Sequence, residues 1–137
     1  MTNFRTGDEL DPLVIAAVDP GKMKTMAVLL RDPNPIHWDP TITSRLGLGE
    51  RPINQGPINA GYLVEMVLRN LGGDVAALKR FCVRFTGNVL SGQRVECTGR
   101  VLEIDESAGT ADLELRAHAD GNLVLAGTAV VRVVDRS

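Results

Sequence analysis

The sequence has few residues of the kinds that build disulfide frameworks and metal sites. It holds two cysteines, Cys82 and Cys97, and two histidines in 137 residues. A secreted disulfide scaffold uses more cysteines, and a metal site uses ligands in recognisable pairs. A zinc site would need every cysteine and histidine, and their spacing supports none. We therefore expect no metal and two reduced, buried thiols.

Charge and hydropathy exclude two further classes of partner. Fifteen Lys and Arg against 17 Asp and Glu give a formal net charge of −2, and no basic patch is dense enough to follow a phosphate backbone. No apolar run reaches the ~18 residues that span a bilayer, and residues 1–9 lack the apolar segment of a signal peptide. We expect a cytoplasmic protein that has no nucleic-acid partner and no membrane span.

The length and composition predict one domain over residues 1–137. A chain of this length can bury a core, but it is too short for a cofactor domain beside a substrate domain. A hydrophobic content of 44% is that of an ordinary globular protein.

The first part of the chain predicts a strand and a short helix. Residues 13–18 are apolar and follow turn residues, as a short strand does. Asp19 then offers an N-cap acceptor, and Pro20 is suited to the first helical position. Apolar residues at helical spacing predict an amphipathic helix over 20–31, which Pro33 prevents from continuing.

A second helix follows a long irregular segment. Residues 38–55 contain several prolines and glycines, and a loop this long in a small domain is usually functional or disordered. Within it, residues 41–46 are expected to form one or two helical turns. Residues 57–71 are apolar on nearly every side, which predicts a helix buried almost all round, ended by Gly72-Gly73.

The rest of the chain predicts an antiparallel sheet. Apolar and polar residues alternate there with a period of two. The expected strands cover residues 81–86, 95–104, 111–119 and 123–134. The last is apolar on both faces, as in a central or interface strand, and His118 falls on a polar face as a surface histidine. Turns at 107–109 and 120–122 join strands. One helix and about five strands predict an α+β domain whose sheet wraps the helix.

A stiff turn carries the clearest catalytic signal. Asp32 and His37 lie five positions apart, and Pro33 and Pro35 between them hold the preceding residues extended. A carboxylate and an imidazole can act as an acid–base pair when both reach the same proton or water, within about 3 Å. The alternative is a turn that only ends the helix, because Asp, Asn and Pro are all turn residues.

Two other positions beside this turn are candidate site residues. Gly56 stands where the second helix begins, and free N–H groups at a helix N-terminus can hold a developing oxyanion. Gly56 also permits a tight entry turn. Trp38, the only tryptophan, follows His37 and is interpreted either as a wall of the site or as core packing.

The run from Asp32 to His37, followed by Trp38-Asp39-Pro40, residues 51–56 and a long apolar helix, resembles the MaoC-like (R)-specific enoyl-CoA hydratases, or type 2 hydratases. Members carry a motif close to Gly-Asp-x-Asn-Pro-(Ile/Leu)-His and a glycine before the central helix. The resemblance covers roughly residues 4–133 in element order and is closest between about 19 and 72. It implies a single hot-dog domain, in which an antiparallel sheet wraps a central helix.

Three residues depart from the family pattern. Arg31 stands where the family usually has Gly, Gln55 where many members have His, and Pro57 where Met is common. None of these changes removes the acid–base pair. Gln55 and Pro57 sit beside the expected substrate.

The resemblance implies an enzyme that interconverts trans-2-enoyl and (R)-3-hydroxyacyl thioesters of CoA or acyl carrier protein, without a cofactor. Asp32 would activate water, and His37 would hold that water and act as acid, although the sequence leaves the division of these duties open. Asn34 would fix the loop, and the Gly56 N–H would polarise the thioester carbonyl. Gln55 and Trp38 would border the substrate.

Two other functions stay open. A hot-dog thioesterase typically uses a carboxylate on the central helix, where Glu65 is the only acid, but its spacing to Arg69 favours a simple ion pair. A non-catalytic subunit that supports an active partner or only binds an acyl thioester is the other alternative. The apolar strand at 123–134 and the apolar helix favour at least a homodimer, with a hetero-oligomer as the alternative.

Overall fold

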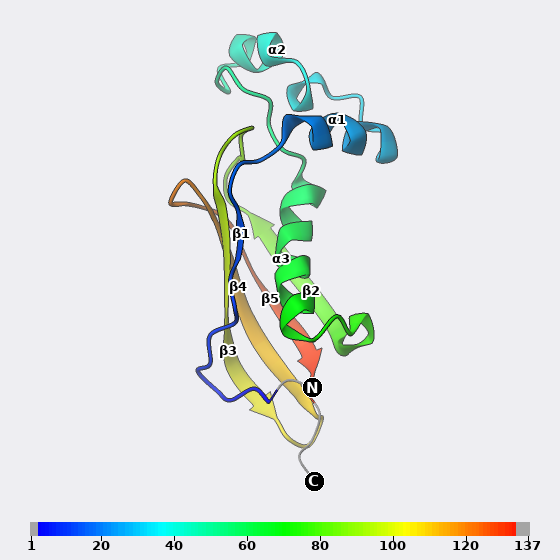
Figure 1. The fold of residues 1–137 in the computed structure, drawn as a ribbon, viewed down its shortest axis with the longest axis vertical. Coiled ribbons are helices and arrows are strands. Elements are labelled where there is room, and N and C mark those ends of the chain that lie inside the picture. The colour runs from blue at the N-terminus through cyan, green and yellow to red at the C-terminus, as the bar shows by residue number, and fades with distance from the viewer. Residues whose placement is uncertain (1–2, 134–137) are drawn as a thin grey trace.

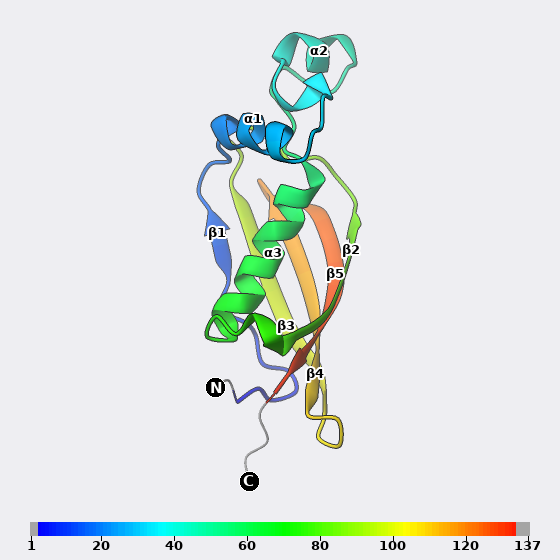
Figure 2. The ribbon, with the colours of Figure 1, turned by 90° about the vertical axis from the view of Figure 1, so that its right-hand side faces the viewer.

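Within residues 3–133, which the computed structural model describes, five antiparallel strands curve around one long helix (Figures 1 and 2). The strands lie in the order β1-β3-β4-β5-β2. Their bounds are β1 Leu13–Ile15, β2 Leu78–Phe85, β3 Val95–Asp105, β4 Thr110–Ala119 and β5 Asn122–Arg132. The α-helices are α1 Pro20–Leu29, α2 Pro40–Arg45 and α3 Gly56–Asn70, and short 3₁₀ turns cover η1 Pro35–His37 and η2 Val75–Ala77. The expected α+β arrangement is confirmed.

The core lies between α3 and the inner face of the sheet. Every second residue of β4 is buried, as the alternation in the sequence predicts. From the helix, Leu63, Met66 and Val67 are fully buried in the same cluster as Leu113 and Leu115. Burial of each such side chain stabilises the fold by about 1.5–3 kcal/mol, so this contact holds α3 in place.

The expectation that this helix is buried almost all round is wrong. Its buried residues are Asn59, Leu63, Met66 and Val67, whereas Gly61 is exposed. The sheet forms one layer and covers one side of α3 (Figure 2). The opposite side, which includes the half-buried Val64, stays partly open in the single chain.

The turns and strands follow the sequence closely. Asp120 and Gly121 both have positive φ, 46° and 83°, which is typical of a two-residue hairpin turn between β4 and β5. His118 is half-buried and lies opposite Glu96 in β3. The first strand is shorter than expected, because only Leu13–Ile15 pairs with β3. The expected end of the last strand, residue 134, lies outside the described residues.

The two thiols differ. Both cysteines are free, but Cys97 is buried in β3 and Cys82 is exposed on β2. The expectation of two buried thiols is therefore wrong for Cys82, which alternates with the core-packed Phe81 and Val83 and so lies on the outer face. Burial raises the pKa of the Cys97 thiol to about 12.

Residues 19–52 form a separate layer beyond the N-terminal end of α3, which we call the overhang (Figure 1). It contains α1, η1 and α2, so the predicted helices at 20–31 and 41–46 are confirmed with shifted ends. Among residues 3–133, no helix is both long and apolar enough to cross a membrane. The overhang carries the candidate acid–base pair.

Candidate active site

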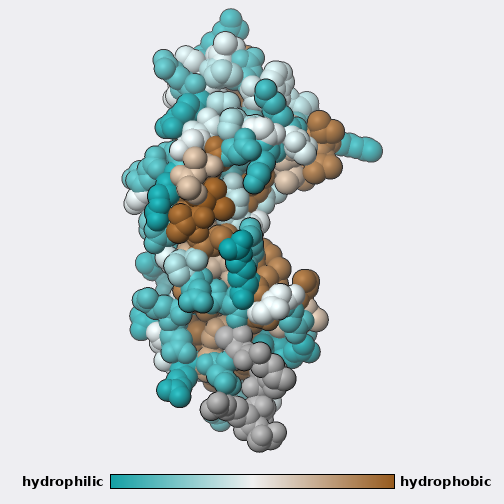
Figure 3. Space-filling view, in the orientation of Figure 1, coloured by the Kyte–Doolittle hydropathy of each residue, from teal (hydrophilic) through white to brown (hydrophobic). Residues whose placement is uncertain are grey.

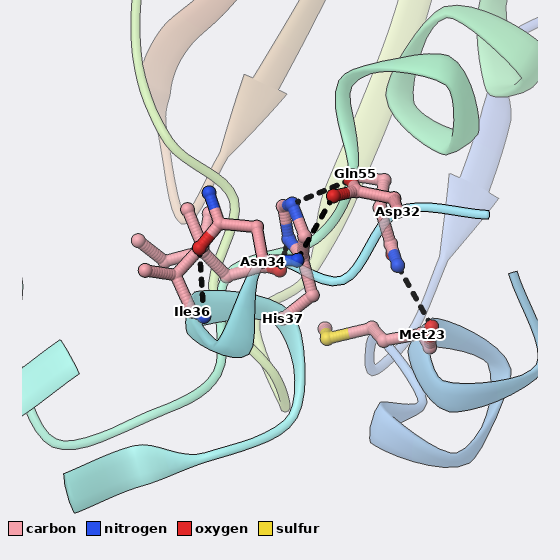
Figure 4. Close-up of polar contacts among 7 residues, drawn as sticks. Met23, Asp32, Asn34, Ile36, His37 and Gln55 are labelled. Carbon is pink, nitrogen blue, oxygen red and sulfur yellow. Dashed lines mark hydrogen bonds and ion pairs between the residues drawn. The ribbon is translucent and has the colours of Figure 1, made fainter. Parts of the chain in front are cut away.

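The structure brings Asp32 and His37 together (Figure 4). After α1, Arg31 takes a left-handed conformation with φ 52°, and the Asp32 N–H donates to the Ala27 carbonyl at 2.9 Å. The chain then turns so that Asp32 Oδ2 lies 3.3 Å from His37 Nε2. His37 is buried and Asp32 is partly exposed. A buried imidazole beside a carboxylate that solvent can reach is a suitable arrangement for proton transfer.

The His37 ring is held by the backbone of the segment that leads into α3. Its Nδ1 lies 2.6 Å from the Ile53 carbonyl oxygen, and because a carbonyl only accepts, Nδ1 carries a proton. Nε2 is therefore the atom that faces Asp32. The pair can hold one proton between Nε2 and Oδ2, or a water molecule that contacts both groups. This geometry suits acid–base chemistry in either direction.

Asn34 shapes the turn between the two groups. Its backbone N–H donates to Asp32 Oδ1 at 3.1 Å, and its side-chain Oδ1 accepts from the Ile36 N–H at 3.2 Å. Asn34 thus caps η1, whose last residue is His37. This position fits the loop-fixing role that the resemblance implies. Trp38 follows η1 and is 45% exposed, so it is not core packing.

The N-terminus of α3 presents one free backbone donor. Gly56 is its first residue, and Pro57 has no N–H. The N–H groups of Ile58 and Asn59 both donate to the Gln55 carbonyl, at 3.0 and 3.2 Å. The Gly56 N–H has no acceptor within residues 3–133. A single unpaired donor at the positive end of a 15-residue helix is suited to an oxyanion.

The backbone of Gly56 is not left-handed, because its φ is not positive. A β-carbon at this position would lie 3.2 Å from Cε1 and 3.3 Å from Cζ of Phe85. Glycine is therefore explained by the close approach of this ring rather than by the entry turn.

Gln55 links the overhang to α3. Its side chain is 1% exposed, and Nε2 donates to the Met23 carbonyl at 2.7 Å (Figure 4). That bond fixes the amide, and its buried Oε1 accepts no hydrogen bond from the described residues. An unpaired buried acceptor costs about 1–3 kcal/mol. Gln55 therefore links the two elements through Nε2, while its Oε1 stays buried without a partner among the described residues.

Beside Gln55 lies a second polar group that the sequence did not single out. Asn54 Nδ2 donates to Asn59 Oδ1 at 2.8 Å and to the Tyr62 hydroxyl at 3.3 Å. Burial raises the pKa of the Tyr62 hydroxyl. Asn54 and Asn59 are buried, so this cluster fixes the segment that carries Ile53 and Gly56.

Sequence reasoning missed the partners that hold the site residues. Ile53 and Met23 act through backbone carbonyls, which their side chains do not signal. Phe85 lies 29 positions after Gly56, and only the paired strands place it there. Among residues 3–133, no three His, Cys, Asp or Glu side chains gather as a metal site would require.

A five-stranded antiparallel sheet wrapped around a central helix is the hot-dog fold. The MaoC-like domain model matches residues 3–122, and the chain belongs to the family of MaoC-like dehydratase domains.

Solved structures share this fold. One is an (R)-hydratase from A. caviae involved in PHA biosynthesis, with a TM-score of 0.86 and 24% identity over 98% of this chain and 100% of that chain. A MaoC-like dehydratase gives 0.89 and 26% over 96% of this chain and 41% of its own, longer chain. The ChsH1-ChsH2 complex from Mycobacterium tuberculosis gives 0.82 and 16% over 95% and 98%. No curated protein matches the sequence significantly.

Proposed function

We propose that the protein is an (R)-specific hydratase/dehydratase that interconverts trans-2-enoyl thioesters and (R)-3-hydroxyacyl thioesters. The observation that carries this proposal is the 3.3 Å contact between Asp32 Oδ2 and His37 Nε2, with the other ring nitrogen held by Ile53. Membership of the MaoC-like family supports it, as does the likeness to an (R)-hydratase.

In the hydration direction, Asp32 accepts a proton from water while the water oxygen bonds to C3 of the enoyl group. The electrons of the C2=C3 double bond shift toward the thioester oxygen, and C2 then receives the proton that the pair holds on His37 Nε2, as the carbonyl forms again. The proton that Asp32 took from water passes to Nε2, which restores the starting state. Dehydration runs the same steps in reverse. An acid–base pair of this kind contributes roughly two to four decades in rate.

The thioester oxygen gains negative charge in this reaction, and the Gly56 N–H donates a hydrogen bond to that oxygen. Its place at the helix N-terminus makes this hydrogen bond stronger in the transition state than in the ground state. Gln55 directly precedes Gly56 in the chain, and its buried, unpaired Oε1 accepts from a water molecule enclosed beside the site. Trp38, exposed beside His37, borders the acyl thioester.

The direct test is spectrophotometric hydration of short, medium and long trans-2-enoyl-CoA and enoyl-carrier-protein thioesters. We expect turnover with at least one of these substrates, and Asp32→Asn should lower it by about two to four decades. Glu50→Gln removes an exposed carboxylate of the same overhang and serves as the matched control. Hydration that is equal in Asp32→Asn and Glu50→Gln would exclude the proposed mechanism.

The thioesterase alternative has weaker support. Glu65 is exposed on α3, and its Oε1 lies 2.5 Å from Arg69 Nη2. The ion pair expected from the i, i+4 spacing is confirmed, and it leaves the carboxylate engaged at the surface. A subunit that supports a catalytic partner stays the main alternative, because a protein with this fold occurs in the ChsH1-ChsH2 complex, which joins two different chains.

We also propose that the chain forms at least a homodimer in the cytoplasm. β2 is an edge strand, and an edge with free N–H and C=O groups can pair with a second copy. Val28 and Leu29, at the end of α1, are 78% and 71% exposed. Figure 3 shows apolar surface at this tip of the overhang, above a hollow beside the body. Free thiols fit a reducing compartment.

Light scattering at micromolar concentration tests this assembly. A dimer or larger oligomer of this chain alone is the expected result. A monomer that becomes active only with a second, different chain would support the partner-subunit alternative.

A further inference from the structure

Phe85 is a residue beside the candidate site to which neither the sequence nor the proposed reaction gives a role. It is the last residue of β2, and its ring lies against the first turn of α3, 3.2–3.3 Å from where a β-carbon of Gly56 would be. The Phe85 ring and the free Gly56 N–H therefore lie beside each other at the N-terminus of α3.

Half of this ring is uncovered. Phe81 and Val83, which alternate with outward-facing residues on β2, pack against the core. Phe85 follows at the same period of two and faces the same side, yet it is 51% exposed. One part of the ring packs on Gly56, and the other presents apolar surface to whatever binds at the N-terminus of α3.

We propose that Phe85 forms the wall of the thioester site beside C2 of the acyl group and selects substrates that have no branch at that carbon. This inference rests on the proposed function. A carbonyl oxygen that accepts from the Gly56 N–H lies about 2.9 Å from that nitrogen, which places the adjoining acyl carbon close to the first turn of α3. A flat, unbranched enoyl group can pack on the ring, whereas a methyl group on C2 meets it.

The test compares hydration of crotonyl-CoA with that of 2-methylcrotonyl-CoA, which differ by one methyl group on C2. In the wild-type protein kcat/KM should be lower for the branched substrate. Phe85→Ala should raise the branched-to-unbranched ratio about tenfold or more, which is the discrimination a pocket exerts on one methyl group. Phe85→Leu should raise it less. Phe81→Leu, on the same strand and face but packed in the core, is the control and should leave the ratio unchanged.

A second measurement tests the contact itself. Gly56→Ala should lower turnover in the wild-type background more than it lowers the melting temperature, because the added methyl group displaces the ring and the donor. In the Phe85→Ala background the methyl group has room, so the same change should cost less. Independent, additive effects of the two substitutions would mean that the Phe85 ring does not limit the space at Gly56.

These outcomes distinguish a failure of the proposed function from a failure of the role proposed for Phe85. If the wild-type protein hydrates no enoyl thioester, the proposed function is wrong, and the role of Phe85 falls with it. If it hydrates crotonyl-CoA but Phe85→Ala leaves the ratio unchanged, only the inference about Phe85 is overturned. An equal rise of KM for both substrates also overturns it, because the ring would then border the sulfur side of the thioester.

Discussion

The overhang and the body of the molecule are held together by different forces. The body, α3 with its five strands, is built on apolar side chains of which many are fully buried. Within the overhang, which the structure describes completely, only Met23, His37 and Thr43 are buried. Since apolar burial is the main source of stability, the body provides most of the stability. The overhang provides the pair of side chains suited to acid–base chemistry, Asp32 and His37.

The overhang is shaped instead by local polar contacts. Each of its three helical segments starts with Asp or Asn followed by proline, and each cap side chain accepts from the N–H two residues on. These pairs are Asp19 with Gly21 at 2.8 Å, Asn34 with Ile36 at 3.2 Å, and Asp39 with Thr41 at 2.9 Å. The Thr41 hydroxyl also lowers the pKa of Asp39. Such caps fix geometry over a few residues without a core.

Three hydrogen bonds connect the two regions at the site: His37 to the Ile53 carbonyl, the Ile53 N–H to the Ile36 carbonyl, and Gln55 to the Met23 carbonyl. The comparison therefore predicts that changes in the body affect stability first, and that changes in the overhang affect catalysis first.

The largest change in stability is expected for Leu63→Ala. Leu63 is fully buried between α3 and the sheet, and such a truncation costs about 2–5 kcal/mol of unfolding free energy. Val64→Ala, on the half-buried side of the same helix, should cost clearly less. Urea unfolding measures both. Equal losses would show that the open side of α3 is covered in solution, as by a second copy.

Asn34→Ala should lower the hydration rate strongly and the stability only slightly, the opposite of Leu63→Ala. Loss of the cap costs about 0.5–2 kcal/mol locally, and the overhang can open without the body, so the urea midpoint should move less than for Leu63→Ala. The acid–base pair loses its fixed spacing, and hydration should fall about 10–100-fold. Unchanged kinetics in this variant would mean that the prolines alone hold the turn.

Arg31→Gly should stabilise the protein slightly. A left-handed conformation costs a non-glycine residue about 1–2 kcal/mol, while glycine adds roughly 0.5–1 kcal/mol of unfolded-state entropy. The net gain should be under about 1 kcal/mol, with hydration little changed. A loss of activity on this substitution would instead assign the Arg31 side chain a role in binding.

The last prediction concerns the reactivity of the two thiols in the native protein. In the native protein one thiol per chain, Cys82, should react with a chromogenic thiol reagent. Cys97 is buried, and its pKa of about 12 leaves almost no thiolate near neutral pH. Cys97 should react only after denaturation, so its labelling rate reports opening of the body. Equal native labelling of both residues would contradict the buried position of Cys97.

The fold was largely predictable because its signals are local. The alternation at 111–119, the turn at Asp120-Gly121 and the cap at Asp19 each depend on a few neighbouring residues, and each is confirmed. The exposure of Cys82 and the open side of α3 were not predicted, because the face of a residue depends on what packs against it from distant segments.

The site was predictable only in part. The short, proline-stiffened span between Asp32 and His37 indicated that they could meet, and they do. Their catalytic roles, with those of Gln55, Gly56 and Trp38, remain predictions. The backbone carbonyl of Ile53 and the ring of Phe85 complete the geometry from positions that no sequence motif marks.

The most direct test of the central claim is the hydration rate of His37→Ala on a trans-2-enoyl-CoA that the wild-type protein turns over. If the overhang supplies the chemistry and the body the stability, the rate should fall by about two to four decades, while the unfolding midpoint stays close to that of the wild type. A folded His37→Ala protein that hydrates the substrate at a near-wild-type rate would contradict the account.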